Sequence, residues 1–126
     1  MEVIFCEDFK KIDSFLLKNT PGDFYRYFRL SKWTNFISAF FNFKFFSLAI
    51  EENNELLAFF PVFLIKSKIF KNHFISIPFC GCGGGIIVKK GSNPGDFISI
   101  FLDKIKELAK EKKVEFIQIR GVEEKY

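Results

Sequence analysis

The stretch from residue 93 to residue 120 limits how this chain can fold more than any other part of the sequence. Asn93 is a predicted N-cap, with Pro94 at the first helical position and Asp96 at the third, so a helix is expected to begin here. Its predicted buried stripe consists of Phe97, Ile98, Phe101, Leu102, Ile105, Leu108 and Ala109. Residues 114–120 are then a predicted strand. Because a helix precedes this strand, we expect it to lie parallel to an earlier one.

The middle of the chain has the pattern of an antiparallel meander. The predicted strands are residues 45–50, 55–68 and 73–79. Asn53 and Asn54 form a favourable hairpin turn between the first two of these strands. The long second strand is expected to bend near Pro61, because proline removes one donor from the ladder. The pattern therefore predicts three consecutive strands that pair antiparallel.

The N-terminal third is predicted to contain a short strand, residues 3–6, and two helices. The first helix follows Asp8, which is a suitable acidic cap, and residues 20–23 end it. The second helix is expected to begin at Ser31, whose hydroxyl is the predicted cap. Its predicted apolar face consists of Trp33, Ile37, Phe40 and Phe41.

Composition places the chain among small globular proteins. Its 126 residues suit one α/β domain, and a hydrophobic content of 48%, with 20 phenylalanines, excludes a disordered chain. The net charge of +4 comes with 15 acidic residues, which favours a mixed-charge surface over a nucleic-acid-binding stripe. The longest apolar run, residues 56–65, is about half the ~20 residues that a membrane span needs. The three cysteines suggest no disulfide and the N-terminus no secretory signal, so a cytoplasmic location is expected.

Four segments in order resemble the Fem-like acyltransferases of the GNAT superfamily. They are Ser31-Lys32-Trp33, the long strand with its basic hairpin at residues 55–70, the glycine-rich segment 73–85, and the strand 115–121 that ends in Arg120 and Gly121. The resemblance implies an α/β fold that is a partial GNAT-like domain over residues 1–126. That domain has a mixed sheet with an antiparallel meander, two N-terminal helices and one crossover helix.

The same resemblance implies a function, the transfer of an acyl or aminoacyl group to an amine. The implied donors are acyl-CoA and aminoacyl-tRNA, and the implied acceptor is a cell-envelope precursor such as the peptidoglycan stem peptide. Self-sufficient GNAT enzymes hold the pyrophosphate of CoA in an Arg/Gln-x-x-Gly-x-Gly/Ala loop at a helix N-terminus. Residues 89–95 do not match this loop, and Pro94 removes one amide donor. The donor site is therefore expected to lie largely outside this chain, which we expect to be inactive alone.

The expected partner is a second GNAT-like half or another copy of the chain. An alternative function is a non-catalytic binding or assembly module that pairs with a partner through an unfinished sheet edge near Arg120. A further alternative is RNA binding by the basic aromatic hairpin at residues 66–74, since lysines attract phosphates. The same lysines also suit a hairpin edge protected against aggregation.

Six residues are candidates for substrate binding. They are Trp33, Phe79, Gly81, Gly83, Gly84 and Arg120. Glycines allow a substrate to approach the backbone closely, and they equally suit a turn or bulge between two strands. Arg120 ends a strand, and strand ends border ligand crevices in open α/β sheets, but a buried ion pair with Glu115, Glu123 or Glu124 is an equal alternative. Trp33 has the helical spacing of a core residue as well as a ring that can stack on a ligand.

No catalytic residue and no metal site is predicted. His73 is the only histidine, and no cluster of Asp and Glu residues provides a general acid–base pair. Cys80, Cys82 and His73 have neither the number nor the spacing of zinc ligands. Small buried thiols are the simpler interpretation of the cysteines.

Overall fold

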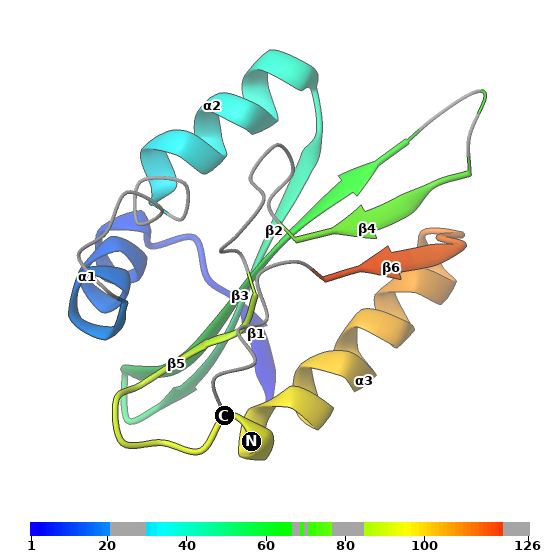
Figure 1. Ribbon diagram of the computed structural model, residues 1–126. Coiled ribbons are helices and arrows are strands. Elements are labelled where there is room, and N and C mark those ends of the chain that lie inside the picture. The colour runs from blue at the N-terminus through cyan, green and yellow to red at the C-terminus, as the bar shows by residue number, and fades with distance from the viewer. Residues whose placement is uncertain (21–29, 67–68, 70, 77–84, 120–126) are drawn as a thin grey trace.

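One twisted sheet with helices on both sides forms the molecule (Figure 1). The computed structural model describes residues 1–20, 30–66, 69, 71–76 and 85–119. Its elements in chain order are β1 (Val3–Phe5), α1 (Phe9–Asn19), α2 (Ser31–Phe41), β2 (Lys44–Glu52), β3 (Glu55–Ile65), β4 (His73–Ile75), β5 (Ile87–Val88), α3 (Gly95–Glu111) and β6 (Phe116–Gln118). The strand order is β1-β2-β3-β4-β6, and β5 also pairs with β3.

The predicted meander and the predicted crossover are both confirmed. Strands β2, β3 and β4 pair antiparallel in sequence order, whereas β6 pairs with β4 in parallel. Asn53 and Asn54 form the β2–β3 turn with φ angles of 54° and 63°, the left-handed region that a two-residue hairpin turn of this type requires. Helix α3 lies on one face of the sheet, as a crossover must to bring β6 beside β4 (Figure 1).

The two faces of the sheet have separate cores. On one face, Ile12 and Leu16 of α1 pack on Phe59, while Ile37 of α2 packs on Phe63. On the other face, α3 packs on alternate residues of the same strands, and the rings of Phe60 and Phe101 meet edge to face at 5.6 Å. Since β3 carries helices on both faces, its interior is a continuous buried run rather than an alternating one.

The partner strand of β3 is interrupted opposite Pro61. In β3, Phe63 pairs with Ile75 of β4, and Phe59 pairs with Ile87 of β5, so β4 and β5 run along β3 in the same direction. Three residues of β3, 60–62, lie between these pairs, whereas the returning chain has eleven, 76–86. The chain thus leaves the sheet between β4 and β5, and we call this place the strand interruption.

Pro61 lies at this interruption for a reason of backbone geometry. The Cys6 N–H donates to the Ser47 carbonyl at 2.8 Å, so the backbone polar groups of Ser47 face β1 and not β3. Pro61, which is opposite Ser47, therefore turns its nitrogen toward the β4–β5 side. Proline lacks the backbone N–H that a strand residue donates, and at position 61 that N–H would point to the gap between β4 and β5. The expected bend near Pro61 stays a prediction. The β2–β3 pairing has a register shift between Ile50 and Glu51 of β2.

Several expectations about α2 are wrong. Ser31 does not cap the helix with its hydroxyl; its N–H and hydroxyl both donate to the carboxylate of Asp13 on α1, at 2.8 Å for the N–H. A carboxylate from another helix therefore supplies the negative charge that a helix N-terminus favours. Phe40 and Phe41 are 69% and 40% exposed and lie outside the buried face, whereas Thr34 is buried beside Ile37.

Smaller differences concern α3 and the ends of strands. Asn93 accepts a hydrogen bond from the Gly95 N–H at 3.0 Å, and α3 begins at Gly95, one residue after Pro94. Ile98 is 37% exposed and does not belong to the buried stripe. The buried residues of α3 are Phe97, Phe101, Ile105 and Leu108. The strands β3 and β6 are shorter than predicted. None of the helices that the structure describes has the length and apolarity of a transmembrane span.

Two phenylalanines test this division between core and surface. Phe101→Ala empties a fully buried site and should lower the free energy of unfolding by about 3–5 kcal/mol. Phe40→Ala, the matched control, should change it by less than about 0.5 kcal/mol because Phe40 is mostly exposed. Urea unfolding followed by circular dichroism measures both values. Equal losses in the two variants would contradict the assigned α2 face.

Candidate functional site

The carboxyl ends of two parallel strands meet beside the strand interruption. Ile75, the last residue of β4, is opposite Gln118, the last residue of β6. The two ends are tied by a hydrogen bond of 3.0 Å from the Ser76 N–H to the Gln118 carbonyl. Because β4 and β6 are parallel and in register, their carboxyl ends lie at the same end of the sheet. Ligand sites in open α/β sheets lie outside such carboxyl ends.

Of the six candidate substrate-binding residues, the structure describes one, Trp33. It lies on α2, half-buried, and packs against the cluster of Ile37, Phe63 and Ile75. Its ring also contacts Phe36, with centroids 5.7 Å apart. The other five candidates, Phe79, Gly81, Gly83, Gly84 and Arg120, lie outside the described residues. Their sequence positions follow β4 and β6, so these candidates remain predictions for the strand interruption.

The N-terminus of α3 uses its backbone donors within the chain. The Gly95 N–H donates to Asn93 Oδ1 at 3.0 Å, and the Asp96 N–H donates to the Asn93 carbonyl at 3.0 Å. The Phe97 N–H donates to the Pro94 carbonyl, also at 3.0 Å. Asp96 further adds a negative charge to this first turn. An anion such as a pyrophosphate needs free N–H groups and no competing carboxylate, so this helix end is poorly suited to one.

His73 and Glu115 have structural partners. The His73 ring stacks on the Phe116 ring, with centroids 4.5 Å apart and planes inclined by 5°. Glu115 forms an ion pair with Lys71 at 2.8 Å, and this hydrogen bond raises the pKa of Lys71. Both residues of the pair are largely exposed, so the pair adds little stability. Within the described residues, no group of three or more His, Cys, Asp or Glu side chains could hold a metal ion.

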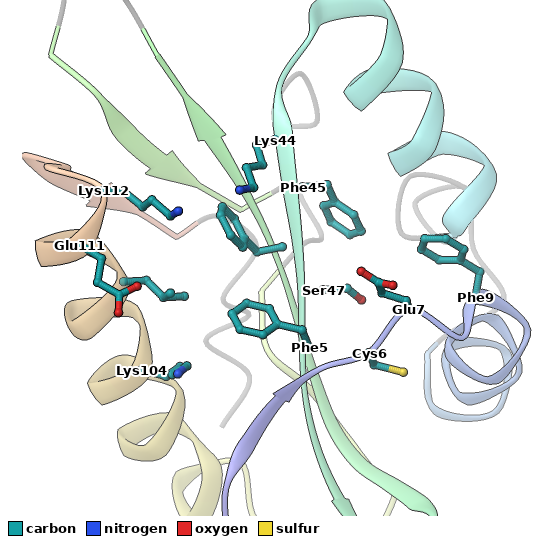
Figure 2. Close-up of a pocket in the computed structure, with 12 residues that line it drawn as sticks. Phe5, Cys6, Glu7, Phe9, Lys44, Phe45, Ser47, Lys104, Glu111 and Lys112 are labelled. Carbon is teal, nitrogen blue, oxygen red and sulfur yellow. The ribbon is translucent and has the colours of Figure 1, made fainter.

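A groove lies at the opposite edge of the sheet, where β1 ends before β2 does (Figure 2). Residues 3–5 cover only Leu48–Ile50 of β2, so Lys44, Phe45 and Phe46 extend past the last β1 residue. The groove has a volume of about 770 Å³. Its lining comes from β1, the start of α1, β2 and α3: Phe5, Cys6, Glu7, Phe9, Lys44, Phe45, Phe46, Ser47, Lys104, Leu108, Glu111 and Lys112.

The chemistry of this groove is that of a binding surface. Figure 2 shows Phe5 directed toward α3 and Cys6 directed to the other side of the strand. Burial raises the pKa of the Cys6 thiol, which opposes formation of the thiolate that a nucleophile needs. Lys104 lies over the Phe5 ring, with Nζ 5.7 Å from the centroid, and Lys44 lies over the Phe46 ring at 5.3 Å. Both lysines thus contact aromatic rings by cation–π interaction.

Ser47 has a buried hydroxyl with no hydrogen-bond partner among the described residues. No local signal in the sequence indicates Ser47, Lys104 or Lys112, so none of them is among the predicted site residues. They meet only because β1 is three residues long and α3 crosses back over the sheet. The groove is therefore a product of topology, and it lies across the sheet from the strand interruption.

Comparison with known proteins bears on the fold. A ribosomal-protein-alanine N-acetyltransferase from Brucella melitensis biovar Abortus 2308 matches 99% of this chain and 83% of its own, with a TM-score of 0.61 and 11% identity. FemX matches 94% of this chain with a TM-score of 0.65 and 19% identity, and the match covers 27% of FemX. A predicted acetyltransferase with acetyl-CoA from Clostridium acetobutylicum matches 93% of this chain and 79% of its own, with a TM-score of 0.56 and 15% identity.

These likenesses confirm the predicted fold class. The chain has an α/β fold of the GNAT acetyltransferase type, with three helices and a mostly antiparallel six-stranded sheet. The chain spans about a quarter of FemX, so it corresponds to a part of that protein. No protein-family model and no curated protein matches the sequence.

Ser47 and Ser38 provide a matched test of the groove. Ser47→Ala removes a buried hydroxyl that lacks a partner, so the free energy of unfolding should rise by up to about 1 kcal/mol. Ser38→Ala removes a hydroxyl that donates to the Phe43 carbonyl at 2.7 Å and should lower it by about 1 kcal/mol. Urea unfolding of both variants gives the two differences. A loss of stability in Ser47→Ala would mean that this hydroxyl is hydrogen-bonded in solution.

Proposed function

We propose that this chain is one part of an N-acyltransferase and supplies the acceptor side of the cleft in which an acyl or aminoacyl group passes to an amine. The single observation that carries the proposal is the acetyltransferase-type sheet whose strand interruption adjoins the carboxyl ends of β4 and β6. The proposed donor is acyl-CoA or aminoacyl-tRNA, and the proposed acceptor is an amine of a peptidoglycan precursor. We also propose a cytoplasmic location, which the free thiol of the buried Cys6 supports.

In the proposed reaction, the unprotonated amine nitrogen attacks the acyl carbonyl carbon. A carbon–nitrogen bond forms, and the bond from that carbon to the thioester sulfur of CoA, or to the ester oxygen of the tRNA, breaks. The proton that the amine loses passes through solvent to the departing sulfur or oxygen. Positioning of the two reactants provides much of the rate in such a transfer. The described residues serve this role by holding the ends of β4 and β6 in fixed register.

In this proposal, the acceptor side belongs to this chain and the donor site to a further portion of protein. The first turn of α3 bonds to Asn93 and Pro94 and carries Asp96, which supports a donor site located elsewhere. The match to only 27% of FemX supports a further portion of protein, either a second GNAT-like half or another copy of this chain. The residues 1–126 are thus proposed to be one incomplete domain, inactive alone.

Nuclear magnetic resonance of the ¹⁵N-labelled chain tests the two sides separately. A lysine-containing pentapeptide of the peptidoglycan stem type should shift the amide signals of Ile75, Ser76, Gln118 and Ile119, because these residues adjoin the proposed acceptor cleft. Acetyl-CoA should leave the signals of Gly95, Asp96 and Phe97 unchanged, because their N–H groups are already bonded. The groove residue Cys6 serves as an internal control, since the pentapeptide should leave its signal in place.

Different failures of this experiment have different meanings. If the pentapeptide and other primary amines shift no signal near β4 and β6, the acceptor role is wrong. If acetyl-CoA shifts the amides of α3, the donor site is in this chain. An amine-dependent release of CoA thiol by the chain alone would contradict the proposed inactivity.

A second candidate function, an assembly module, is favoured by the position of β6. This strand is last in the sheet order of the described residues, and Phe116 on it is 48% exposed. An edge strand with an exposed ring can pair with a strand of another chain. Light scattering that gives the mass of a monomer at all concentrations would exclude assembly with a second copy.

A further inference from the structure

A row of aromatic rings runs along helix α2 and just past its end. Its two end members, Trp33 and Phe43, also pack against the core, and the rings between them lie on the outer side of the helix. We call Trp33, Phe36, Phe40, Phe41 and Phe43 the α2 aromatic row. Neighbouring rings are in contact along the whole row, with centroid separations of 5.7, 5.5, 4.9 and 5.4 Å in that order. The row therefore forms one continuous apolar surface instead of five separate side chains.

The middle of this row is open to solvent. Phe36 is 50% exposed, Phe40 69% and Phe41 40%. The helix meets its core through Thr34 and Ile37 on its other side, so the exposed rings are not needed to hold α2 on the sheet. Figure 1 shows α2 outside the sheet on the side opposite α3. Contiguous exposed aromatic surface of this kind marks a site of interaction.

Positive charge accompanies the rings. Lys32 stands four residues before Phe36 and eight before Phe40, so it shares their stripe of the helix. At the other end of the helix, Lys44 and Lys66 line a hollow of about 390 Å³ together with Phe41, Asn42, Phe43 and Leu64. No acidic residue lines this hollow. The basic groups thus lie at both ends of the aromatic row.

The described segment around α2 carries no acidic residue. Residues 30–50 contain two lysines, seven aromatic residues and no aspartate or glutamate. A surface that is aromatic and positive is complementary to an anionic one. The carboxylate of Asp13, at the N-terminus of α2, is hydrogen-bonded to Ser31.

We infer that the α2 aromatic row binds the surface of a membrane that contains anionic phospholipids. The rings of Phe36, Phe40 and Phe41 enter the boundary between head groups and acyl chains, and Lys32 and Lys66 contact the phosphates. A helix with lysines and aromatic rings on its outer side lies in the membrane plane, not across it. A protein partner is less favoured, because interfaces with proteins are depleted in lysine. The inference is independent of the acyltransferase proposal.

Trp33 gives a direct measurement, because it is the only tryptophan in the chain and belongs to the row. Titration of the full chain with vesicles that contain phosphatidylglycerol should shift its fluorescence to shorter wavelength and yield a partition coefficient. Vesicles of phosphatidylcholine alone should bind much more weakly. Binding to the anionic vesicles should also fall when the salt concentration is raised to about 0.5 M, since salt screens the lysine–phosphate attraction.

Two double variants separate this surface from general hydrophobicity. Phe36→Asn/Phe40→Asn should lower partitioning into anionic vesicles by about tenfold or more, as measured by sedimentation with the vesicles. The matched control, Phe5→Asn/Ile98→Asn, removes two exposed apolar side chains on the α3 side and should bind like the parent chain. Circular dichroism of both variants confirms that they are folded before the comparison is made.

Three results would overturn the inference. The first is a parent chain that does not bind anionic vesicles at low salt. The second is equal binding by the two double variants. The third is a chain that self-associates through Phe36 and Phe40 in light scattering and binds no vesicles, which would make the row an interface between protein chains. Lys32→Glu/Lys66→Glu is expected to weaken vesicle binding without changing Phe36 or Phe40, and unchanged binding would also count against the inference.

Discussion

Burial of β3 on both faces is the constraint on which the rest of the structure depends. From Ala58 to Leu64, every residue of this strand is buried. The strand pairs with β2 along its whole length on one side, and with β4 and β5 on the other. Helices on opposite faces contact alternate residues of the same strand, so β3 contributes buried side chains to the cores on both faces of the sheet. A loss of apolar volume in β3 therefore weakens both layers at once.

Much of this architecture follows from local sequence signals. Asn53 and Asn54 can adopt the left-handed backbone of a hairpin turn at low cost, so the β2–β3 register is visible in the sequence. The spacing of Phe97, Phe101, Ile105 and Leu108 likewise indicates the crossover helix, and the helix in turn makes β6 parallel. These are features in which one short segment contains the whole physical reason for its structure.

Other features depend on segments that are far apart and could not be predicted. The cap of α2 is Asp13, eighteen residues away on another helix, where Ser31 itself had the composition of a cap. Phe40 has the same helical spacing as a core residue, but the sheet beneath α2 is reached only by Ile37 and its neighbours. The groove beside Ser47 exists because β1 ends at Phe5. The sequence around Ser47 contains no signal for where β1 ends. For the proposed acyl-transfer site, a fold alone does not identify the reactants, which depend on particular side chains.

The strand interruption also affects how such a protein can change. Both flanking pairs, Phe63 with Ile75 and Phe59 with Ile87, are fixed by their own contacts, and neither register depends on the number of residues between 75 and 87. Residues can therefore be added or removed between Ser76 and Ile86 without turning any buried side chain of β4 or β5 to the opposite face, which a single insertion inside a continuous strand would do. The segment between β4 and β5 can thus vary in length although it lies in the middle of a sheet, where insertions normally disturb strand register. Loop grafting there offers a route to new specificity on an unchanged scaffold.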